Sequence, residues 1–117
     1  MTLTEKATRL KIFTGEENRI RHRPLYEVIV EEARKQGLAG ASVYRGVMGY
    51  GANSQVRTTS ILRLSEDLPL IIEIIDQPEK IEKFTEFLSE NMTEGLVTSE
   101  EVTIVIHTHN KGEKQKK

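Results

Sequence analysis

The residues best suited to bind a ligand form a glycine-rich segment near the middle of the chain. Residues 43–51 read Val-Tyr-Arg-Gly-Val-Met-Gly-Tyr-Gly, so one arginine precedes a Gly-x-x-Gly-x-Gly pattern. Glycine lets the backbone bend through positive φ and lets a ligand approach the main chain closely. Main-chain N–H groups of such a loop bind anions, and we expect Arg45 and Arg57 to assist them. The three glycines are Gly46, Gly49 and Gly51.

This pattern matches neither of two common phosphate-binding motifs. A Walker loop would continue into Gly-Lys-Ser/Thr, and a dinucleotide-binding fingerprint would be followed by a helix. Here a polar stretch without periodicity follows, from Ala52 to Ser60. A loop of this length in a small domain is usually functional or disordered. Besides ligand binding, it can contact a protein partner alone or form a tight turn at a subunit corner.

A basic cluster lies shortly before a predicted helix that begins at Pro24. The N-terminus of a helix favours anions, so the cluster can draw a phosphate or a carboxylate toward it. The interpretation that we favour is a solvated basic loop paired with Glu16 and Glu17. The cluster consists of Arg19, Arg21, His22 and Arg23.

The chain has three histidines, and two of them are close together near its end. His107 and His109 share a face if the last strand continues to them. A zinc-type site normally needs three or four ligands, and His22 is the one remaining histidine. We therefore favour a frayed strand end over a metal site.

Glu73 and Tyr44 offer an acid and a phenol, but no nearby nucleophile or base marks a catalytic site. We expect Glu73 to pair with an arginine, such as Arg45 or Arg63. The sequence therefore predicts that the protein is not an enzyme.

Composition limits the classes of protein that have to be considered. The chain has 117 residues, a net charge of −1 and no cysteine, which indicates one domain without disulfides or cysteine ligands. The balanced charge gives no support for nucleic-acid binding. No apolar run approaches the roughly 20 residues that a membrane helix needs, and the N-terminus lacks the apolar core of a signal peptide. We expect a cytoplasmic protein without direct membrane insertion.

Hydrophobic periodicity and turn residues predict the elements that position the glycine-rich segment. The order β-α-β-β-α-β indicates an α+β, ferredoxin-like fold in which an antiparallel sheet carries two helices on one face. We expect a flexible N-terminus over 1–7, a folded domain over 8–109 and a disordered charged tail over 110–117. The predicted elements are strand Arg9–Thr14, a charged loop Glu16–Arg23, a helix from Pro24 to a left-handed stop at Gly37, strand Gly40–Arg45, a return arm Ser60–Leu64, strand Leu68–Asp76, a helix that begins at Pro78, and strand Leu96–His107, which can be interrupted around Ser99-Glu100-Glu101.

The second face of the predicted sheet is too apolar to meet water. Alternation along the strands places Ile71 and Ile75 on this second face. In the first strand it places Phe13 there, opposite to Leu10 and Ile12. Burying such a side chain stabilises by roughly 1.5–3 kcal/mol, so three or four of them favour association. We therefore expect a homo-oligomer.

Several segments together resemble the PII-like family of unknown function, which is similar in fold to the nitrogen regulatory PII proteins and to the CutA-type copper-tolerance proteins. The resemblance covers about residues 8–107. The segments that carry it are Gly15–Glu16, Pro24–Glu27, Val43–Gly51, Ser65–Leu70 and Gly95–Thr98.

The resemblance implies a homotrimer whose sheets face the threefold axis and which binds nucleotide in the clefts between subunits. Residues 47–60 would be the T-loop, and residues 91–98 would also contribute to the cleft. The ligand-binding residues implied in this way are Arg45, Gly46, Gly49, Tyr50, Gly51, Gln55, Arg57, Gly95 and Thr98. The resemblance further implies that the T-loop acts on a protein target, either a membrane transporter or an enzyme.

The second cleft segment departs from the PII pattern. Residues 92–97, Met-Thr-Glu-Gly-Leu-Val, contain one glycine, a glutamate and no lysine. A nucleotide with fewer phosphates than ATP, or another small anion, therefore remains open as the ligand. We expect a PII-like regulatory protein with no certain cofactor and an adenine nucleotide as the candidate ligand. The alternatives are a CutA-like metal-binding or metal-tolerance trimer carried by the histidines, and an enzyme of unknown reaction at the subunit cleft.

Overall fold

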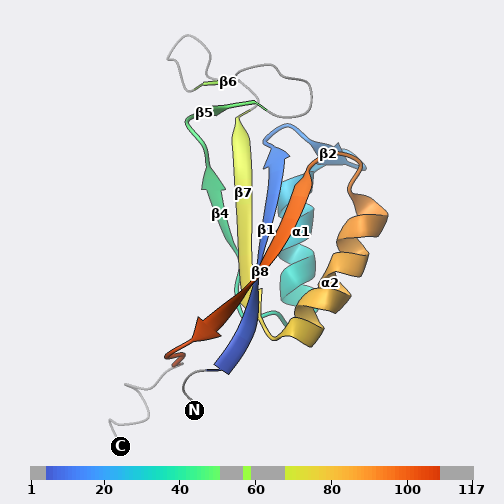
Figure 1. Ribbon diagram of the computed structural model, residues 1–117. Coiled ribbons are helices and arrows are strands. Elements are labelled where there is room, and N and C mark those ends of the chain that lie inside the picture. Colours follow the sequence, from blue (N-terminus) through green and yellow to red (C-terminus); the bar gives the residue numbers. More distant parts are fainter. Residues whose placement is uncertain (1–4, 51–56, 59–67, 109–117) are drawn as a thin grey trace, which may run out of the picture.

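The computed structural model describes residues 5–50, 57–58 and 68–108. In this part of the chain the two helices lie side by side on one face of the main sheet, and the other face is left open (Figure 1). In chain order the elements are β1 (Glu5–Gly15), β2 (Arg19–Ile20), β3 (Arg23–Pro24), α1 (Leu25–Lys35), β4 (Ser42–Arg45), β5 (Met48–Gly49), β6 (Arg57–Thr58), β7 (Pro69–Asp76), α2 (Pro78–Asn91) and β8 (Leu96–Ile104).

The main sheet confirms the predicted ferredoxin-like arrangement. Its strands are ordered β4-β7-β1-β8, and every neighbouring pair is antiparallel. Two short hairpins, β2–β3 and β5–β6, lie outside it. Successive side chains of a strand point to opposite faces, so Leu10 and Ile12 face the helices while Arg9 and Phe13 belong to the open face.

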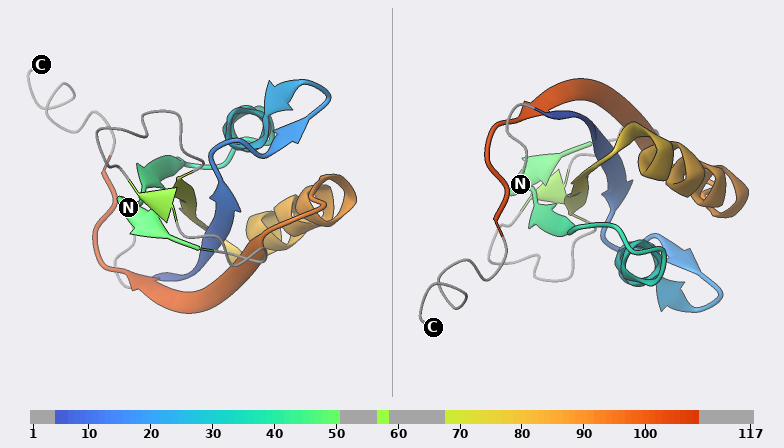
Figure 2. Two further views of the ribbon diagram at one scale, coloured as in Figure 1. Left: turned by 90° about the horizontal axis from the view of Figure 1, so that it is seen from above. Right: turned by 90° about the horizontal axis from the view of Figure 1, so that it is seen from below.

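The core lies between the sheet and the two helices, which share one side of it in both end-on views (Figure 2). Apolar residues recur at helical spacing in both helices, so each has one apolar stripe that packs on the strands. The most completely buried large side chains of the described residues include Phe84, Leu10, Ile12, Leu25, Ile29, Ile72 and Ile74.

Proline and glycine set the helix boundaries close to the predicted positions. Pro78 opens α2, as expected from its fixed φ and missing N–H. Pro24 lies one residue outside α1, at the N-cap, because its ψ of 131° is extended. Gly37 has φ +81°, which confirms the left-handed stop after α1.

The predicted charged loop over residues 16–23 contains a short hairpin that was not predicted. Residues 19–24 form the β2–β3 hairpin, whose turn residues Arg21 and His22 have φ of 51° and 73°. Two consecutive positive φ values are typical of a type I′ turn, which usually carries Asn-Gly or Gly-Gly. The sequence has no such residues here, so the turn could not be recognised.

The strands of the main sheet differ from the prediction mostly at their ends. β1 begins at Glu5 rather than Arg9, because Glu5 to Thr8 pair with the far end of β8. β4 begins two residues later than expected, at Ser42. β8 ends at Ile104 and runs without the expected interruption. The predicted return arm over residues 60–64 and the charged tail lie outside the described residues.

The open face of the sheet is partly apolar, as the alternation predicted. Phe13, Ile71 and Leu96 are direct neighbours on it, and Ile75 lies further along β7. Leu96 is 58% exposed and Ile75 is 36% exposed. Within the described residues, neither helix combines the length and apolar character that a membrane crossing needs.

Candidate functional site

The glycine turn between β4 and β5 packs directly on Pro69, the first residue of β7. The Gly46 amide donates to the Pro69 carbonyl at 2.7 Å. A Cβ atom on Gly46 would lie 2.8 Å from Pro69 Cγ, and one on Gly49 would lie 3.1 Å from the same atom. Both glycines therefore have a packing role, and their predicted role in ligand binding stays a prediction.

The other predicted residues of this turn have different surroundings. Arg45 donates from Nη2 to Oε2 of Glu16 at 2.5 Å, so its charge is already paired within the chain. Tyr50 is 70% exposed. Arg57 lies in β6, which pairs with β5 through Gly49. Gly51 and Gln55 lie outside the described residues.

The second predicted cleft segment, residues 91–98, contacts the same end of the sheet, and we call it the Gly95 segment. Gly95 has φ +132°, and a Cβ atom there would lie 2.8 Å from the carbonyl oxygen of Phe13. Asn18, which follows β1, donates from Nδ2 to the carbonyl of Glu94 at 3.2 Å. Thr98 pairs with Lys11 further along β8. The turn after β1 thus lies between the glycine turn, through Glu16, and the Gly95 segment, through Asn18.

A small hollow lies beside the Gly95 segment. Its volume is about 380 Å³, and it is formed by the last turns of α2 and the start of β8. Leu88, Met92 and Val97 give it an apolar lining, and Glu94 is its one carboxylate. The hydroxyls of Thr85 and Ser89 already donate to carbonyls of α2.

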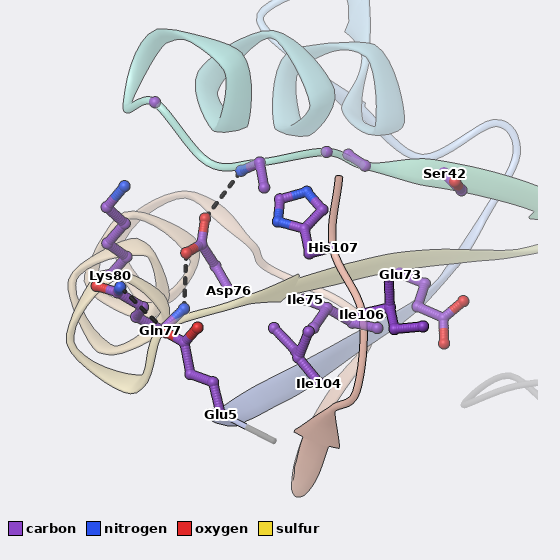
Figure 3. Close-up of a pocket in the computed structure, with 14 residues that line it drawn as sticks. Glu5, Ser42, Glu73, Ile75, Asp76, Gln77, Lys80, Ile104, Ile106 and His107 are labelled. Atoms are coloured by element: carbon purple, nitrogen blue, oxygen red, sulfur yellow. Dashed lines mark hydrogen bonds between the residues drawn. The ribbon is translucent and has the colours of Figure 1, made fainter. Parts of the chain in front are cut away.

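A larger hollow lies at the opposite end of the sheet and was not predicted (Figure 3). Its volume is about 580 Å³. One wall is the connection from α1 to β4, which runs from Gly37 to Ser42, and another is the segment 104–107 that follows the end of β8. Figure 3 shows the His107 ring near the first of these walls and Ile106 beside Glu73. The hollow brings together residues about 65 positions apart, so no local pattern could reveal it.

The buried carboxylate of Asp76 fixes the first wall of this hollow. Asp76 is 9% exposed. Its Oδ2 accepts from the Ala39 amide at 2.8 Å, and its Oδ1 accepts from the Gln77 amide at 2.6 Å. The end of β7 therefore holds both the α1–β4 connection and the start of α2.

The lining of the hollow combines apolar and charged groups. Ile75, Ile104 and Ile106 give it an apolar side. Its carboxylates belong to Glu5, Glu73 and Asp76, whereas Lys80 is its one lysine. Because carboxylates outnumber cations, the hollow favours a neutral group over a phosphate.

Four polar residues form a chain of contacts across the open face, beside this hollow. The Tyr44 hydroxyl donates to Oε1 of Glu73 at 3.2 Å. Arg9 Nη1 lies 3.6 Å from Oε2 of Glu73, and Arg9 Nη2 donates to Oε2 of Glu100 at 2.7 Å. The hydrogen bond between Arg9 and Glu100 raises the pKa of Arg9 and lowers the pKa of Glu100. Tyr44 and Glu73 are thus in contact, and Glu73 pairs with an arginine as expected. This arginine is Arg9 and not Arg45, which pairs with Glu16, and Arg63 lies outside the described residues.

The basic hairpin makes an ion-pair cluster with α1 that was not predicted. Arg23 donates to both carboxylate oxygens of Glu31, at 2.8 and 2.7 Å, and lies 3.5 Å from Glu27. The hydrogen bond to Glu31 is the main reason why the pKa of Arg23 is raised. Arg19 donates to the carbonyl of His22 at 3.3 Å. The expected pairing of this cluster with Glu16 was wrong, because Glu16 pairs with Arg45.

The described residues give no support to a metal site. Among residues 5–50, 57–58 and 68–108, no three His, Cys, Asp or Glu residues are close enough together to hold an ion. His22 lies in the β2–β3 turn and His107 lines the large hollow at the other end of the sheet. His109 lies outside the described residues.

Comparison with known proteins relates this chain to one family. The model of DUF190, described as "Uncharacterized ACR", matches residues 7–104. A UPF0166 protein of Aquifex aeolicus is 38% identical over 96 residues, which cover 82% of this chain and 90% of that protein.

Solved structures share the fold at low sequence identity. A PII-like signaling protein of Thermus thermophilus has a TM-score of 0.65 and 19% identity, and the match covers 97% of this chain and 98% of that one. CPII, a nitrogen regulatory PII-like protein of Thiomonas intermedia, has a TM-score of 0.58 and 12% identity, with 89% and 98% of the two chains covered. That CPII structure was solved with ADP, AMP and bicarbonate bound. The fold of this chain is therefore that of PII-like proteins.

Proposed function

The chain belongs to the DUF190 family, and from this premise we propose that it is a homotrimeric PII-like regulatory protein that binds an adenine nucleotide between its subunits. The observation that carries the proposal is the large hollow, because it lies where a second chain on the open face would close it. Glu73, Ile75 and Ile104 line the hollow and also belong to that face. The proposal includes no chemical reaction.

The hollow suits the base of a nucleotide better than its phosphates. A base is flat, largely apolar and neutral at pH 7, so it can pack against Ile75 and Ile106. β4 is an edge strand, and the segment that leads into it offers main-chain groups to the rim of a base. The carboxylates of Glu5 and Glu73 repel phosphates and keep them outside the hollow.

The glycine turn is the second half of the proposed site and has to come from a neighbouring subunit. β7 begins at Pro69 beside this turn and ends at Asp76 beside the hollow. Seven residue steps of about 3.3 Å separate the two by roughly 23 Å, which is longer than a mononucleotide. One chain therefore cannot supply both halves, whereas two chains that pack through their open faces can.

The acidic groups around both halves favour nucleotides with few phosphates. Glu94 lies beside Gly95, and Arg45 is already paired with Glu16. We therefore place AMP and ADP ahead of ATP as ligands. Binding would reposition residues 47–60, which then contact a protein target, in the way that ligand-ordered segments act in other switches.

Calorimetry with AMP, ADP and ATP on the full chain tests the proposal. A Cβ atom on Gly40 would meet nothing within 4 Å, so this position accepts a side chain without a clash. Gly40→Leu should fill the hollow and weaken AMP and ADP binding at least about tenfold, or about 1.4 kcal/mol. Gly40→Ala is the matched control and should bind nearly as the natural chain does.

Further measurements separate this proposal from the alternative of a metal-binding trimer. Hydrogen exchange of residues 47–60 should slow when AMP or ADP is added, and light scattering should give the mass of three chains. Copper and zinc salts should leave the melting temperature unchanged. Nucleotide binding that is absent, or equally strong in Gly40→Leu, would refute the assignment of the hollow.

A further inference from the structure

The open face of the sheet has apolar residues at both ends and charged residues between them. Near the glycine turn, Ile71, Phe13 and Leu96 lie side by side across three strands. Near the large hollow, Ile75 and Ile104 give the other end an apolar surface. Four residues that we call the polar belt run diagonally across the face from one end to the other: Tyr44, Glu73, Arg9 and Glu100. Tyr44 lies opposite Ile71, whereas Arg9 lies opposite Ile75.

The polar belt crosses every strand of the main sheet. Tyr44 comes from β4, Glu73 from β7, Arg9 from β1 and Glu100 from β8. Glu73 is 22% exposed at its side chain, and Arg9 is 31% exposed. Ionised groups this close to an apolar surface need partners in a fixed geometry, because burying them unpaired is costly.

Within one chain the belt leaves hydrogen-bonding groups unused. The contact between Arg9 and Glu73 is 3.6 Å long, which is an ion pair without a good hydrogen bond. Lys11 lies opposite Glu73 in the register, and no described carboxylate is within 4.0 Å of its amine. The belt therefore presents donors beside the acceptors of Glu73, Glu100 and Tyr44.

We propose that the polar belt selects the register and the number of copies in which identical chains associate through their open faces. This inference rests on the proposed function, because it concerns the same self-association. The occupant is a second copy of this chain, since a belt with both donors and acceptors complements itself. A uniformly charged partner would match only one half of it.

Directional polar groups can fix the register between two open faces, whereas the apolar ends cannot. Apolar contact is roughly proportional to area and has no preferred direction, so two such faces can slide or rotate against each other. A shifted register would desolvate the Lys11 amine and the outer faces of the Glu73 and Glu100 carboxylates without new partners, at about 1–3 kcal/mol for each group. A single buried polar residue fixes register and copy number in coiled coils by the same principle.

Native mass spectrometry of the full chain tests this role. The test variant is Arg9→Met/Glu73→Leu/Glu100→Leu, which replaces the charges of the belt with side chains of similar size. The matched control is Lys6→Met/Glu101→Leu, which removes an ion pair of 3.8 Å between β1 and β8, the two strands that the Arg9–Glu100 pair also joins. Side chains of this control pair are 76% and 71% exposed, so their loss should leave association unchanged.

We expect the natural chain and the control to give one oligomer of a single mass. The test variant should stay associated but give several masses, because its apolar face no longer prefers one register. A single unchanged mass in the test variant would overturn the inference and leave the proposed function standing. A natural chain that is monomeric at micromolar concentration would overturn both.

A milder variant covers the case in which the triple variant fails to fold. Arg9→Lys keeps the positive charge but removes the planar geometry of the guanidinium and its two terminal nitrogens, which face Glu73 and Glu100. Sedimentation should then show the dissociation constant of the oligomer raised at least about tenfold. An unchanged constant, with circular dichroism unchanged as well, would show that the belt does not contribute to association.

Discussion

The ring of Pro69 occupies the space that a side chain on Gly46 would need. Pro69 Cγ lies 2.8 Å from the position of such a Cβ atom, and the Pro69 carbonyl accepts from the Gly46 amide at 2.7 Å. The first glycine of the turn is therefore required by packing between β4 and β7, whether or not a ligand binds nearby.

Gly46→Ala should destabilise the fold, because the proline ring and the strand behind it must shift. Inserting a methyl group into packed surroundings typically costs about 1–3 kcal/mol. Gly40→Ala is the control, since nothing lies within 4 Å of its Cβ position, and it should change the free energy of unfolding by less than about 0.5 kcal/mol. Urea denaturation at one fixed protein concentration measures both. Equal values for the two variants would contradict the role of Pro69.

Gly95→Ala should cost more than Gly37→Ala, although both positions have positive φ. Gly37 has φ +81° in open space, so alanine there meets only the backbone penalty of about 1–2 kcal/mol. At Gly95 the φ is +132°, and the Cβ atom would also lie 2.8 Å from the Phe13 carbonyl oxygen. We expect a loss of about 2–4 kcal/mol in the same denaturation experiment. A smaller loss at Gly95 than at Gly37 would show that the Phe13 contact relaxes freely.

Periodic segments with strong boundary residues were the predictable part of this fold. β7 is rich in β-branched residues and Pro78 follows it, so strand, helix and boundary were located to within one residue. The remaining strand boundaries depend on pairing across the sheet. β1 extends back to Glu5 because Ile104 lies opposite it, and no pattern around Glu5 indicates that partner.

The candidate site was harder to predict than the fold, for two physical reasons. Glycine has more than one use, and the sequence could not show that Gly46 packs against Pro69. The large hollow depends on segments 37–42 and 104–107 meeting beside the end of β7, which only the tertiary structure reveals. Contact between Tyr44 and Glu73 was within reach, because alternation places both on the open face of neighbouring strands.

Acid should remove the contribution of the Arg23–Glu31 pair to stability. The hydrogen bond from Arg23 lowers the pKa of Glu31 below its ordinary 4.5. A lowered pKa in the folded state contributes stability that is present above the unfolded pKa and is lost as pH falls through the folded value. The natural chain should therefore be more stable than Glu31→Gln above pH 4.5, and the two should converge below it.

Melting curves recorded across this pH range measure the difference. Glu79→Gln, on the other helix, is the control and should run parallel to the natural chain. The effect should be small and should decrease with added salt, because the pair is solvent-exposed. A difference between natural chain and Glu31→Gln that persists unchanged at low pH would exclude the ion pair as its source.

Replacing Asp76 should lower both the stability of the chain and its affinity for AMP. Asp76→Ala leaves the amides of Ala39 and Gln77 without their present acceptor, and a buried unsatisfied group costs about 1–3 kcal/mol. Because the Ala39 amide positions one wall of the large hollow, AMP binding should weaken more than the loss of stability alone explains. Asp76→Asn keeps the shape and one acceptor oxygen, so it should lie between the natural chain and Asp76→Ala in both measurements. Calorimetry at a temperature where all three chains are folded separates the two effects, and an AMP affinity that is unchanged in Asp76→Ala would show that the hollow does not hold the nucleotide.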